Sequence, residues 1–341
     1  MKKNKPLVSL IIVNWNGKKY LSSCLRSLSQ VTYRPIEIIV VDQNSSDGSQ
    51  PFVKKNYPNV MLIENETNTG YVGGNNLGVT KARGKYAMIL NNDIEVDKNF
   101  LQSLVAVMEK DKRIGCVQPK ALNLRHKGKL DGGGSLLTRT GFLYHKGFYE
   151  DASNPEYNKP YFVYSVKGAY MFFRRELFMK LGGLDRDFFI YFEESDFCGR
   201  LWVAGYTVKY IPTSIVYHWG GGDTSKDWEK KFALVQYRSF KNRLCSYIKN
   251  MQLSTLIYLL PVHLAISQVG VLYYLFTGKW RVSVAIEKAI GWNIIHLPST
   301  SEKRRLIQKM RKASDSDIFS LTGKRVSLGY YLHGLALLSK S

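Results

Sequence analysis

Short apolar runs rich in β-branched residues alternate with helix-length segments over the first 118 residues, and this alternation restricts the possible fold more than any other feature of the chain. The runs predict strands at 7–13, 36–41, 59–63, 85–90 and 114–118. The segments between them predict helices around 18–29, 49–56, 71–82 and 98–110. Because the runs are apolar throughout rather than alternating, they indicate parallel strands buried on both faces. This part of the chain is therefore predicted to be a doubly wound α/β domain.

The region that follows changes character. Residues 119–165 are rich in glycine and aromatic residues and predict a long hairpin-like insertion over one end of the sheet. Regular structure returns with a strand and a helix that ends at Gly182–Gly183, a typical glycine stop. A short helix near 195–204 and a strand at 206–211 complete this part.

Residues 253–276 contain no charged side chain and are long enough to span a bilayer, which needs about 20 residues. Pro261 and His263 interrupt the stretch, and both flanks are basic, so a single span would export a basic flank against the positive-inside tendency. The strongly cationic segment 302–312 follows. Together these features favour an in-plane or re-entrant membrane anchor. A true span and a buried pair of hydrophobic helices remain the alternatives.

The chain carries 49 Lys and Arg against 27 Asp and Glu, a formal charge of +22. This excess predicts a polyanionic partner: nucleic acid, an anionic membrane surface or phosphorylated small molecules. The basic residues are dispersed and no RNA- or DNA-binding motif is present, so nucleic acid is not expected.

The four cysteines are far apart and form no C-x-x-C pair, which suggests neither a zinc site nor a disulfide framework. Reduced thiols are typical of a protein facing the cytosol. The basic head and the apolar run at 7–13 imitate a signal peptide, but Asn14, Trp15 and Asn16 follow instead of a cleavage site. The run is better interpreted as a first buried strand.

Polar residues follow the predicted strands at the points where they end. Asn14 and Asn16 follow the first strand, and Asp42 follows the second. In an open α/β sheet, ligands bind beyond the carboxyl ends of the strands, where a carboxylate such as Asp42 can accept a pyrimidine N3–H or a ribose hydroxyl. Asp47 is better interpreted as a helix cap. No G-x-G-x-x-G follows a strand and no Walker motif exists, so the sequence lacks the dinucleotide and P-loop signatures.

A glycine-rich segment, Asn68 to Gly78, opens the helix after the third strand. It lets the backbone approach a ligand near a helix N-terminus, which suits phosphate, although a purely structural turn has the same pattern. The fourth strand ends in Asn91, Asn92 and Asp93. A divalent ion could bridge Asp93 and a diphosphate there, since Mg²⁺ commonly uses one or two carboxylates plus phosphates. A turn-forming aspartate is the alternative.

An acidic pair, Glu193 and Glu194, stands among phenylalanines and tyrosines. Crowded carboxylates in such surroundings have raised pKa values, which suits a general base. Asp196 can cap the helix or pair with Arg200 at i+4. His218 ends an apolar run before a glycine loop, where it is either a structural histidine or a ligand for a metal or phosphate.

Taken in order and spacing, these pieces resemble the inverting glycosyltransferases of family 2 over residues 7 to about 245. The resemblance rests on N-W-N-G, V-V-D-x-x-S-x-D-G, N-x-G-Y-x-G-G-N-N-x-G, N-N-D in place of D-x-D, G-A-x-x-x-x-R-R-E, G-G-x-D-x-x-F-F, F-E-[DE]-x-D-x-x-x-R-L and the H-W-G loop. The long C-terminal extension and the motif style look most like bacterial rhamnosyltransferases of cell-surface polysaccharide assembly.

The resemblance implies a GT-A fold, a Rossmann-like mixed sheet flanked by helices, with a C-terminal helical extension. It implies a catalytic domain at 1–245, with a nucleotide-sugar half at about 1–118 and an acceptor half at about 119–245, and a membrane-associating region at 246–341. Glu194 would be the general base, and a divalent metal, Mg²⁺ or Mn²⁺, would be held by Asp93 and His218. The acceptor-side residues would be Glu193, Asp185 and Asp196. The nucleotide-sugar site would include Asn14, Asn16, Asp42, Gly70, Gly73, Gly74, Asn75, Asn76, Asn91 and Asn92.

Two departures from the family pattern bear on this site. Gln43 stands where the family usually has Asn, and the metal motif has a single carboxylate. The second departure weakens the inference of tight metal binding without removing it.

The resemblance thus implies a transferase that moves a sugar, rhamnose favoured, from a dTDP- or UDP-sugar to a lipid-linked or polysaccharide acceptor. We expect it to act at the cytoplasmic face of the cell membrane as a peripheral or re-entrant protein on an anionic surface. A relative using galactose, glucose or N-acetylglucosamine is the alternative within the family. Two non-catalytic alternatives lie outside it: a basic protein that binds membranes or nucleic acid, and a scaffold that has kept the fold.

Overall fold

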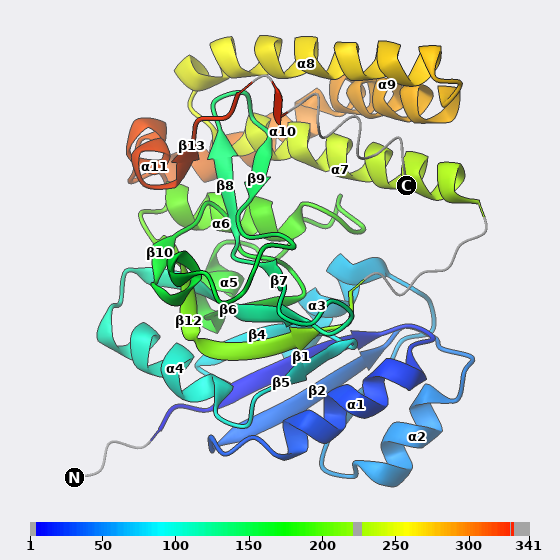
Figure 1. Cartoon of the computed structure of the whole chain (residues 1–341), viewed down its shortest axis with the longest axis vertical. Coiled ribbons are helices and arrows are strands. Elements are labelled where there is room, and N and C mark those ends of the chain that lie inside the picture. The colour runs from blue at the N-terminus through cyan, green and yellow to red at the C-terminus, as the bar shows by residue number, and fades with distance from the viewer. Residues whose placement is uncertain (1–4, 221–226, 328, 331–341) are drawn as a thin grey trace. The chain divides into compact units, whose positions relative to one another are not determined.

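The computed structural model describes residues 5–220, 227–327 and 329–330, and the chain folds as two compact units (Figure 1). Unit 1 comprises Met1–Ser135 and His145–Asp223. Unit 2 comprises Leu136–Tyr144 and Thr224–Ser341. The boundary expected at residue 245 falls inside helix α7, Trp228–Asn250, which belongs to unit 2.

Unit 1 is built on one mixed sheet, with strand order β10-β12-β6-β11-β4-β1-β2-β3, and with β5 paired to β12 and β7 paired to β6. The strands are β1 (Val8–Asn14), β2 (Ile36–Asp42), β3 (Met61–Glu64), β4 (Tyr86–Asn91), β5 (Ile94–Val96), β6 (Ile114–Asn123), β7 (Leu130–Gly132), β10 (Tyr161–Phe162), β11 (Tyr170–Arg174) and β12 (Thr207–His218). Strands β1 to β4 are parallel, and β11 is antiparallel to both β4 and β6. The predicted mixed α/β class is confirmed.

Helices cover both faces of this sheet. They are α1 (Lys18–Ser29), α2 (Ser49–Asn56), α3 (Gly70–Lys81), α4 (Phe100–Lys110), α5 (Arg175–Lys180), α6 (Glu193–Val203) and the 3₁₀ turn η1 (Pro155–Asn158). Residues Val8, Leu10 and Ile12 of β1 join one buried cluster with the apolar sides of α1 and α4. Because successive strand residues face opposite ways, Ile11 and Val13 meet α3, whose Gly78 and Gly74 lie against them. The apolar runs are therefore buried on both faces, as predicted.

Strand β12 runs seven residues beyond the end predicted for it. The strand was predicted at 206–211, and Pro212, which cannot donate to a ladder, follows that range. The register with β6 shifts between Ile211 and Ile215, and the pairing then continues to His218. The Ser214 hydroxyl donates to the carbonyl of Phe100 at 2.7 Å within this irregularity. The resumed strand carries His218 to the sheet edge opposite β5.

Unit 2 is mainly helical. Besides α7 it contains α8 (Leu253–Phe276), α9 (Trp280–Ile295), α10 (Leu297–Lys309) and α11 (Asp315–Thr322). A small sheet joins β13 (Gly323–Lys324) to the hairpin of β8 (Ser135–Thr138) and β9 (Leu143–His145). The insertion expected over the sheet end is thus divided: β7 stays on the sheet of unit 1, and most of the β8–β9 hairpin belongs to unit 2.

Helix α8 is continuous through Pro261. Among the described helices, it alone is long and apolar enough to cross a membrane, and 39% of its apolar window is buried in the protein. On its buried side, His263 Nδ1 donates to the carbonyl of Thr140 at 2.8 Å, and the ring stacks on Phe240.

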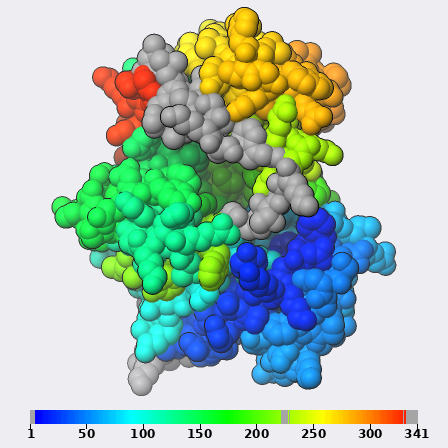
Figure 2. All heavy atoms as spheres, turned by 45° about the vertical axis from the view of Figure 1, so that its right-hand side comes forward, coloured from blue at the N-terminus to red at the C-terminus, as the bar shows by residue number. Residues whose placement is uncertain are grey.

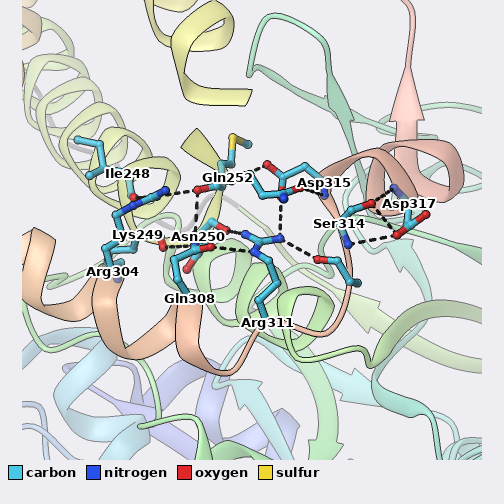
Figure 3. A network of polar contacts seen from close by, with 12 residues as sticks. Ile248, Lys249, Asn250, Gln252, Arg304, Gln308, Arg311, Ser314, Asp315 and Asp317 are labelled. Carbon is cyan, nitrogen blue, oxygen red and sulfur yellow. Dashed lines mark hydrogen bonds and ion pairs between the residues drawn. The ribbon is translucent and has the colours of Figure 1, made fainter. Parts of the chain in front are cut away.

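Two arginines of the cationic segment 302–312 point into unit 2 (Figure 3). Arg304 donates to the carbonyls of Ile248 and Met251, and Arg311 donates to Asn250 and to Asp315 Oδ1, the latter at 2.9 Å. The carbonyls of Ile248, Asn250 and Met251 lie at the C-terminal end of α7, where backbone carbonyls have no partner within the helix. The side chains therefore cap α7, and the segment is not wholly the membrane-facing cationic surface that its composition suggested.

Candidate active site

The carboxyl ends of the parallel strands bring together three of the predicted nucleotide-site residues. Asn14 pairs in register with Asp42, and its Nδ2 donates to Asp42 Oδ2 at 2.9 Å. Asn92 Nδ2 donates to Asn14 Oδ1 at 2.8 Å. Gly17 makes this contact possible, because a Cβ there would lie 2.0 Å from Asn92 Nδ2. The three side chains form one polar row across the ends of β1, β2 and β4.

Asp42 is almost fully buried and organises the loop that follows it. Its Oδ1 accepts from the Ser45 amide at 2.9 Å and from Gln50 Nε2 at 2.8 Å. Asn16, at φ 50°, accepts at Oδ1 from the Ser46 amide at 2.8 Å. The two loops after β1 and β2 therefore hold each other in place, which fixes the Asp42 carboxylate beside the strand ends.

The glycine-rich segment is shaped by protein contacts. A Cβ on Gly70 would meet the ring of Phe189 at 2.6 Å, and one on Gly73 would meet Thr69 at 2.4 Å. A Cβ on Gly74 would lie 2.1 Å from Nε2 of Gln43. Neighbouring side chains thus already fill the space beside these glycines, which explains the pattern without a ligand. Their contact with a nucleotide sugar stays a prediction.

The unusual Gln43 has a full set of partners in unit 1. Its Nε2 donates to the Gly70 carbonyl at 3.0 Å, and its Oε1 accepts from the Thr69 amide at 3.0 Å. Asn65 Nδ2 also donates to Oε1, at 3.0 Å. The longer glutamine side chain therefore links the end of β2 to the start of α3.

The two asparagines of α3 differ in environment. Asn76 makes a two-way contact with the backbone of Leu184, through Nδ2 and Oδ1 both at 2.9 Å. Asn75 is fully buried and donates to the Tyr71 carbonyl, but its Oδ1 has no hydrogen-bond partner in the part of the chain that the structure describes. The Asn76 side chain thus links α3 to the Leu184 backbone, whereas Asn75 Oδ1 is an unused hydrogen-bond acceptor among the described residues. Asn91 is half-buried at the end of β4.

The structure brings the two predicted metal ligands together. His218 pairs with Ile94 at the β12–β5 edge, and its Nε2 lies 3.4 Å from Asp93 Oδ1. That oxygen is buried and has no hydrogen-bond partner among the described residues. An orphaned carboxylate oxygen facing an imidazole nitrogen is a donor set suited to a divalent cation. In residues 5–220 and 227–327, no three His, Cys, Asp or Glu side chains are grouped so as to hold a metal ion.

Asp131 is a charged residue of this site that the sequence interpretation missed. It lies on β7, is 3% exposed, and its Oδ2 is 2.8 Å from His218 Nδ1. Lys167 Nζ and the Tyr170 hydroxyl reach the same oxygen at 2.5 and 2.9 Å. An aspartate before three glycines is ordinary turn chemistry, and only the pairing of β7 with β6 brings it to His218.

The acidic pair opens α6 behind a strained turn. Tyr191 and Phe192 both adopt the left-handed region, at φ 75° and 70°, which costs a non-glycine residue of order 1–3 kcal/mol. Glu193 is 4% exposed, and its Oε2 has no hydrogen-bond partner among the described residues. Glu194 is half-buried, and the Ser195 hydroxyl donates to its Oε1 at 2.9 Å. Of the two carboxyls that follow this turn, that of Glu194 is therefore the less buried.

Burial and the adjacent Glu194 charge raise the pKa of Glu193 well above its ordinary value. Burial also raises the pKa of Glu194, against the Ser195 hydrogen bond and the charge of Lys167. Two carboxyls crowded in this way titrate as a pair. Both shifts are upward, which suits a pair in which one carboxyl accepts a proton.

Burial lowers the pKa of His218, but the hydrogen bond to Asp131 and the nearby Asp93 carboxylate outweigh it, so the net shift is upward. Burial alone would raise the pKa of Asp131, and the His218 contact and the Lys167 charge bring it below its ordinary value. The contact between these two residues thus contributes to both shifts.

The remaining residues predicted on the acceptor side are Asp196 and Asp185. Asp196 is fully buried, and its Oδ2 accepts from Arg200 Nε at 3.0 Å. Arg200 also donates to the carbonyls of Leu181 and Gly183. This is the structural alternative offered by the i, i+4 spacing, and the contact of Asp196 with an acceptor stays a prediction. Asp185 is half-buried in the loop before α6, where its Oδ1 accepts from the Asp187 amide at 3.1 Å.

Comparison with known protein families gives one match over half of the chain. Residues 9–182 match the model of "Glycosyl transferase family 2". Among curated proteins, an N-acetylglucosaminyl-diphospho-decaprenol L-rhamnosyltransferase of Mycobacterium tuberculosis is 24% identical over 248 residues, covering 65% of this chain and 78% of the relative. The low-salt glycan biosynthesis hexosyltransferase Agl10 of Haloferax volcanii is 27% identical over 199 residues, covering 57% of this chain and 61% of the relative.

Solved structures share the fold at lower identity. GalNAc-T7 with UDP, GalNAc and Mn²⁺ has a TM-score of 0.56 at 22% identity, covering 72% of this chain, which spans 48% of that protein. The Pyrobaculum calidifontis mannosyltransferase PcManGT with GDP-Man and Mn²⁺ has a TM-score of 0.54 at 16% identity, covering 90% of this chain and 84% of the neighbour. Residues 1–349 of Staphylococcus aureus TarS with UDP give 0.53 at 15% identity, with 89% and 90% covered.

Proposed function

The chain belongs to glycosyl transferase family 2 and is a glycosyltransferase, and we propose that it transfers a sugar from a nucleotide donor to a lipid-linked glycan with inversion at the anomeric carbon. The observation that carries this proposal is the acidic pair at the start of α6. Glu194 combines a raised pKa with partial exposure, which suits a base that takes the proton of an acceptor hydroxyl.

The proposed reaction is a direct displacement. The acceptor oxygen loses its proton to Glu194 as it attacks the anomeric carbon on the face opposite the leaving group. The bond to the nucleoside diphosphate breaks with its electron pair, so no covalent sugar–enzyme intermediate forms. The neighbouring Glu193 stays protonated and keeps a second negative charge away from the reaction.

The diphosphate is proposed to bind at the strand ends. Asp93 and His218 would hold Mg²⁺ or Mn²⁺, which when bound stabilises the charge that develops on the leaving diphosphate. The buried, unpartnered Asp93 Oδ1 supports this assignment. Asp42 would contact the uracil or thymine ring, and the loops after β1 and β2 would hold it there.

The donor is proposed to be a dTDP- or UDP-sugar, with rhamnose favoured. The mycobacterial relative is a rhamnosyltransferase whose name includes a lipid diphosphate, and this supports both the sugar and a lipid-linked acceptor. Galactose, glucose and N-acetylglucosamine remain the competing sugars, since the same fold serves different donors.

We further propose that unit 2 rests on the cytoplasmic face of an anionic membrane. Figure 2 shows α8 and α9 as adjoining yellow and orange surfaces. Both helices expose large apolar side chains, among them Leu253, Ile257, Tyr258, Val262, Val269, Leu272, Phe276, Trp280, Ile294 and Ile295. The opposite side of α8 packs on the protein along its length, which favours an in-plane position over a span. The exposed cations Arg281 and Lys288 of α9 suit anionic headgroups.

Vesicle flotation tests the membrane surface. The protein is expected to float with phosphatidylglycerol vesicles and less with phosphatidylcholine vesicles. The double change Val269→Gln and Leu272→Gln should reduce flotation, whereas Leu321→Gln, at an exposed apolar residue of α11, should not. Equal flotation of the α8 variant would refute this surface.

A donor screen tests the enzymatic proposal. UDP- and dTDP-sugars are incubated with the protein, Mn²⁺ and a lipid-linked acceptor extract, and release of the nucleoside diphosphate is measured. We expect release that depends on the acceptor, is highest with dTDP-rhamnose and is lost in EDTA. No release with any donor would overturn the proposal, and activity unchanged by EDTA would overturn its metal.

A further inference from the structure

One buried carboxylate, Asp131, stands behind the proposed metal site. It is held by three side chains of unit 1: His218 Nδ1 at 2.8 Å, Lys167 Nζ at 2.5 Å and the Tyr170 hydroxyl at 2.9 Å. Only His218 among these three also faces Asp93. The carboxylate is thus positioned to act on the metal site through the imidazole ring.

The two ring nitrogens of His218 have different partners. A carboxylate only accepts hydrogen bonds, so an Nδ1 that lies 2.8 Å from Asp131 Oδ2 must carry the proton. In the neutral ring, Nε2 then carries the lone pair, and it points towards Asp93 Oδ1 at 3.4 Å. The hydrogen bond therefore fixes both the tautomer and the direction of the ring.

We propose that Asp131 is a positioning residue that holds His218 in the Nδ1–H form, so that Nε2 and the free Asp93 oxygen together face one divalent cation. The inference deepens the proposed function and rests on its metal site. A carboxylate that accepts a hydrogen bond from the other ring nitrogen of a metal-binding histidine raises the basicity of that histidine. Its loss typically lowers metal affinity by about 10–100-fold.

A purely structural role for Asp131 makes a different prediction. In that case the buried carboxylate serves mainly to pair Lys167 and Tyr170, and any variant that disturbs the cluster has the same effect. Tyr170→Phe separates the two roles, because it removes one donor to Asp131 Oδ2 and leaves the His218 contact intact. Asp131→Asn keeps the volume but replaces the charged acceptor with an amide that can donate to Nδ1.

Metal affinity is measured without turnover, by titrating Mn²⁺ against each protein with and without UDP and following the electron paramagnetic resonance of free Mn²⁺. We expect Asp131→Asn to weaken Mn²⁺ binding about 10–100-fold and Tyr170→Phe to change it less than threefold. Equal affinities in wild type and Asp131→Asn would overturn the positioning role while leaving the metal site standing. A wild type that binds no Mn²⁺ even with UDP would overturn the metal site of the proposed function itself, and the positioning role with it.

The tautomer is measured directly by ¹⁵N NMR of histidine side chains in the full-length protein with Mg²⁺ and UDP, using His218→Gln to assign the signal. We expect Nδ1 to carry hydrogen and Nε2 to be the unprotonated nitrogen. This measurement on the wild type stands even if Asp131→Asn does not fold. A proton on Nε2 in the Mg²⁺–UDP complex would overturn the proposal.

Discussion

Helix α6 carries two neighbouring pairs of ionisable side chains, Glu193 with Glu194 and Asp196 with Arg200, and their surroundings differ. Asp196 and Arg200 are both buried and form an ion pair at 3.0 Å. The remaining N–H groups of the Arg200 side chain include donors to two backbone carbonyls, those of Leu181 and Gly183. Glu193 and Glu194 are adjacent carboxyls, form no ion pair among the described residues, and follow two strained residues. The charges of Asp196 and Arg200 neutralise each other, and the pair stabilises the fold. The carboxyls of Glu193 and Glu194 instead have raised pKa values, which is typical of functional sites.

The largest expected effect is on turnover. Glu194→Gln removes the proposed proton acceptor and keeps its size, so turnover should fall about 10²–10⁴-fold, the usual contribution of general base catalysis. Donor binding, followed by calorimetry with the nucleoside diphosphate, should be unchanged. Turnover like that of the wild type would remove the base assignment.

The compensated pair should respond in stability instead. Asp196→Asn leaves the buried Arg200 guanidinium without its counter-charge, and breaking a buried pair in this way costs about 3–5 kcal/mol of unfolding free energy. Urea unfolding measures the loss. The matched control is Asp187→Asn, an exposed carboxyl of the preceding loop, which should stay within about 0.5 kcal/mol of the wild type.

The arginines of the basic segment 302–312 in unit 2 extend the comparison. They test whether hydrogen bonds to α7 carbonyls and to Asp315 also stabilise the fold. Arg311→Met removes donors to the Asn250 carbonyl and to Asp315 (Figure 3), and should cost about 1–3 kcal/mol of unfolding free energy. Arg305→Met, at an exposed arginine of α10, should cost about 0.5 kcal/mol or less. Equal losses in the two variants would argue against the capping of α7.

The smallest effect concerns stability against pH. The folded protein raises the pKa of Glu193, so the folded state keeps a proton that the unfolded chain releases, and stability falls as pH rises above the unfolded value. Glu193→Gln removes this penalty. We expect the melting temperature of Glu193→Gln to exceed that of the wild type by more at pH 8 than at pH 5. A difference independent of pH would contradict the raised pKa.

Periodicity and turn chemistry were enough to predict the elements that depend on local sequence. The predicted helices 18–29 and 49–56 agree with α1 and α2, because glycines and a continuous apolar side mark their limits. The pattern failed at β12, where pairing with β6 and β5 carries the strand past Pro212. Tertiary pairing overrode a local stop signal there.

The site was predictable where a motif places its residues at the ends of neighbouring strands, as for Asn14 and Asp42. It was not predictable for Asp131, since only the sheet topology brings β7 beside the end of β12. Nor could composition tell which arginines of 302–312 face inwards, because that depends on which α7 carbonyls lack partners. Such outcomes depend on contacts between segments far apart in the chain.

The central claim, that Glu194 is the base and Glu193 its protonated neighbour, is tested most directly by the pH dependence of kcat/KM in the two single variants. A glutamine mimics a protonated carboxyl, so Glu193→Gln should keep kcat/KM within about tenfold of the wild type, with the acidic limb in place, while Glu194→Gln loses activity across the whole range. The reverse pattern, an active Glu194→Gln and an inactive Glu193→Gln, would contradict the account.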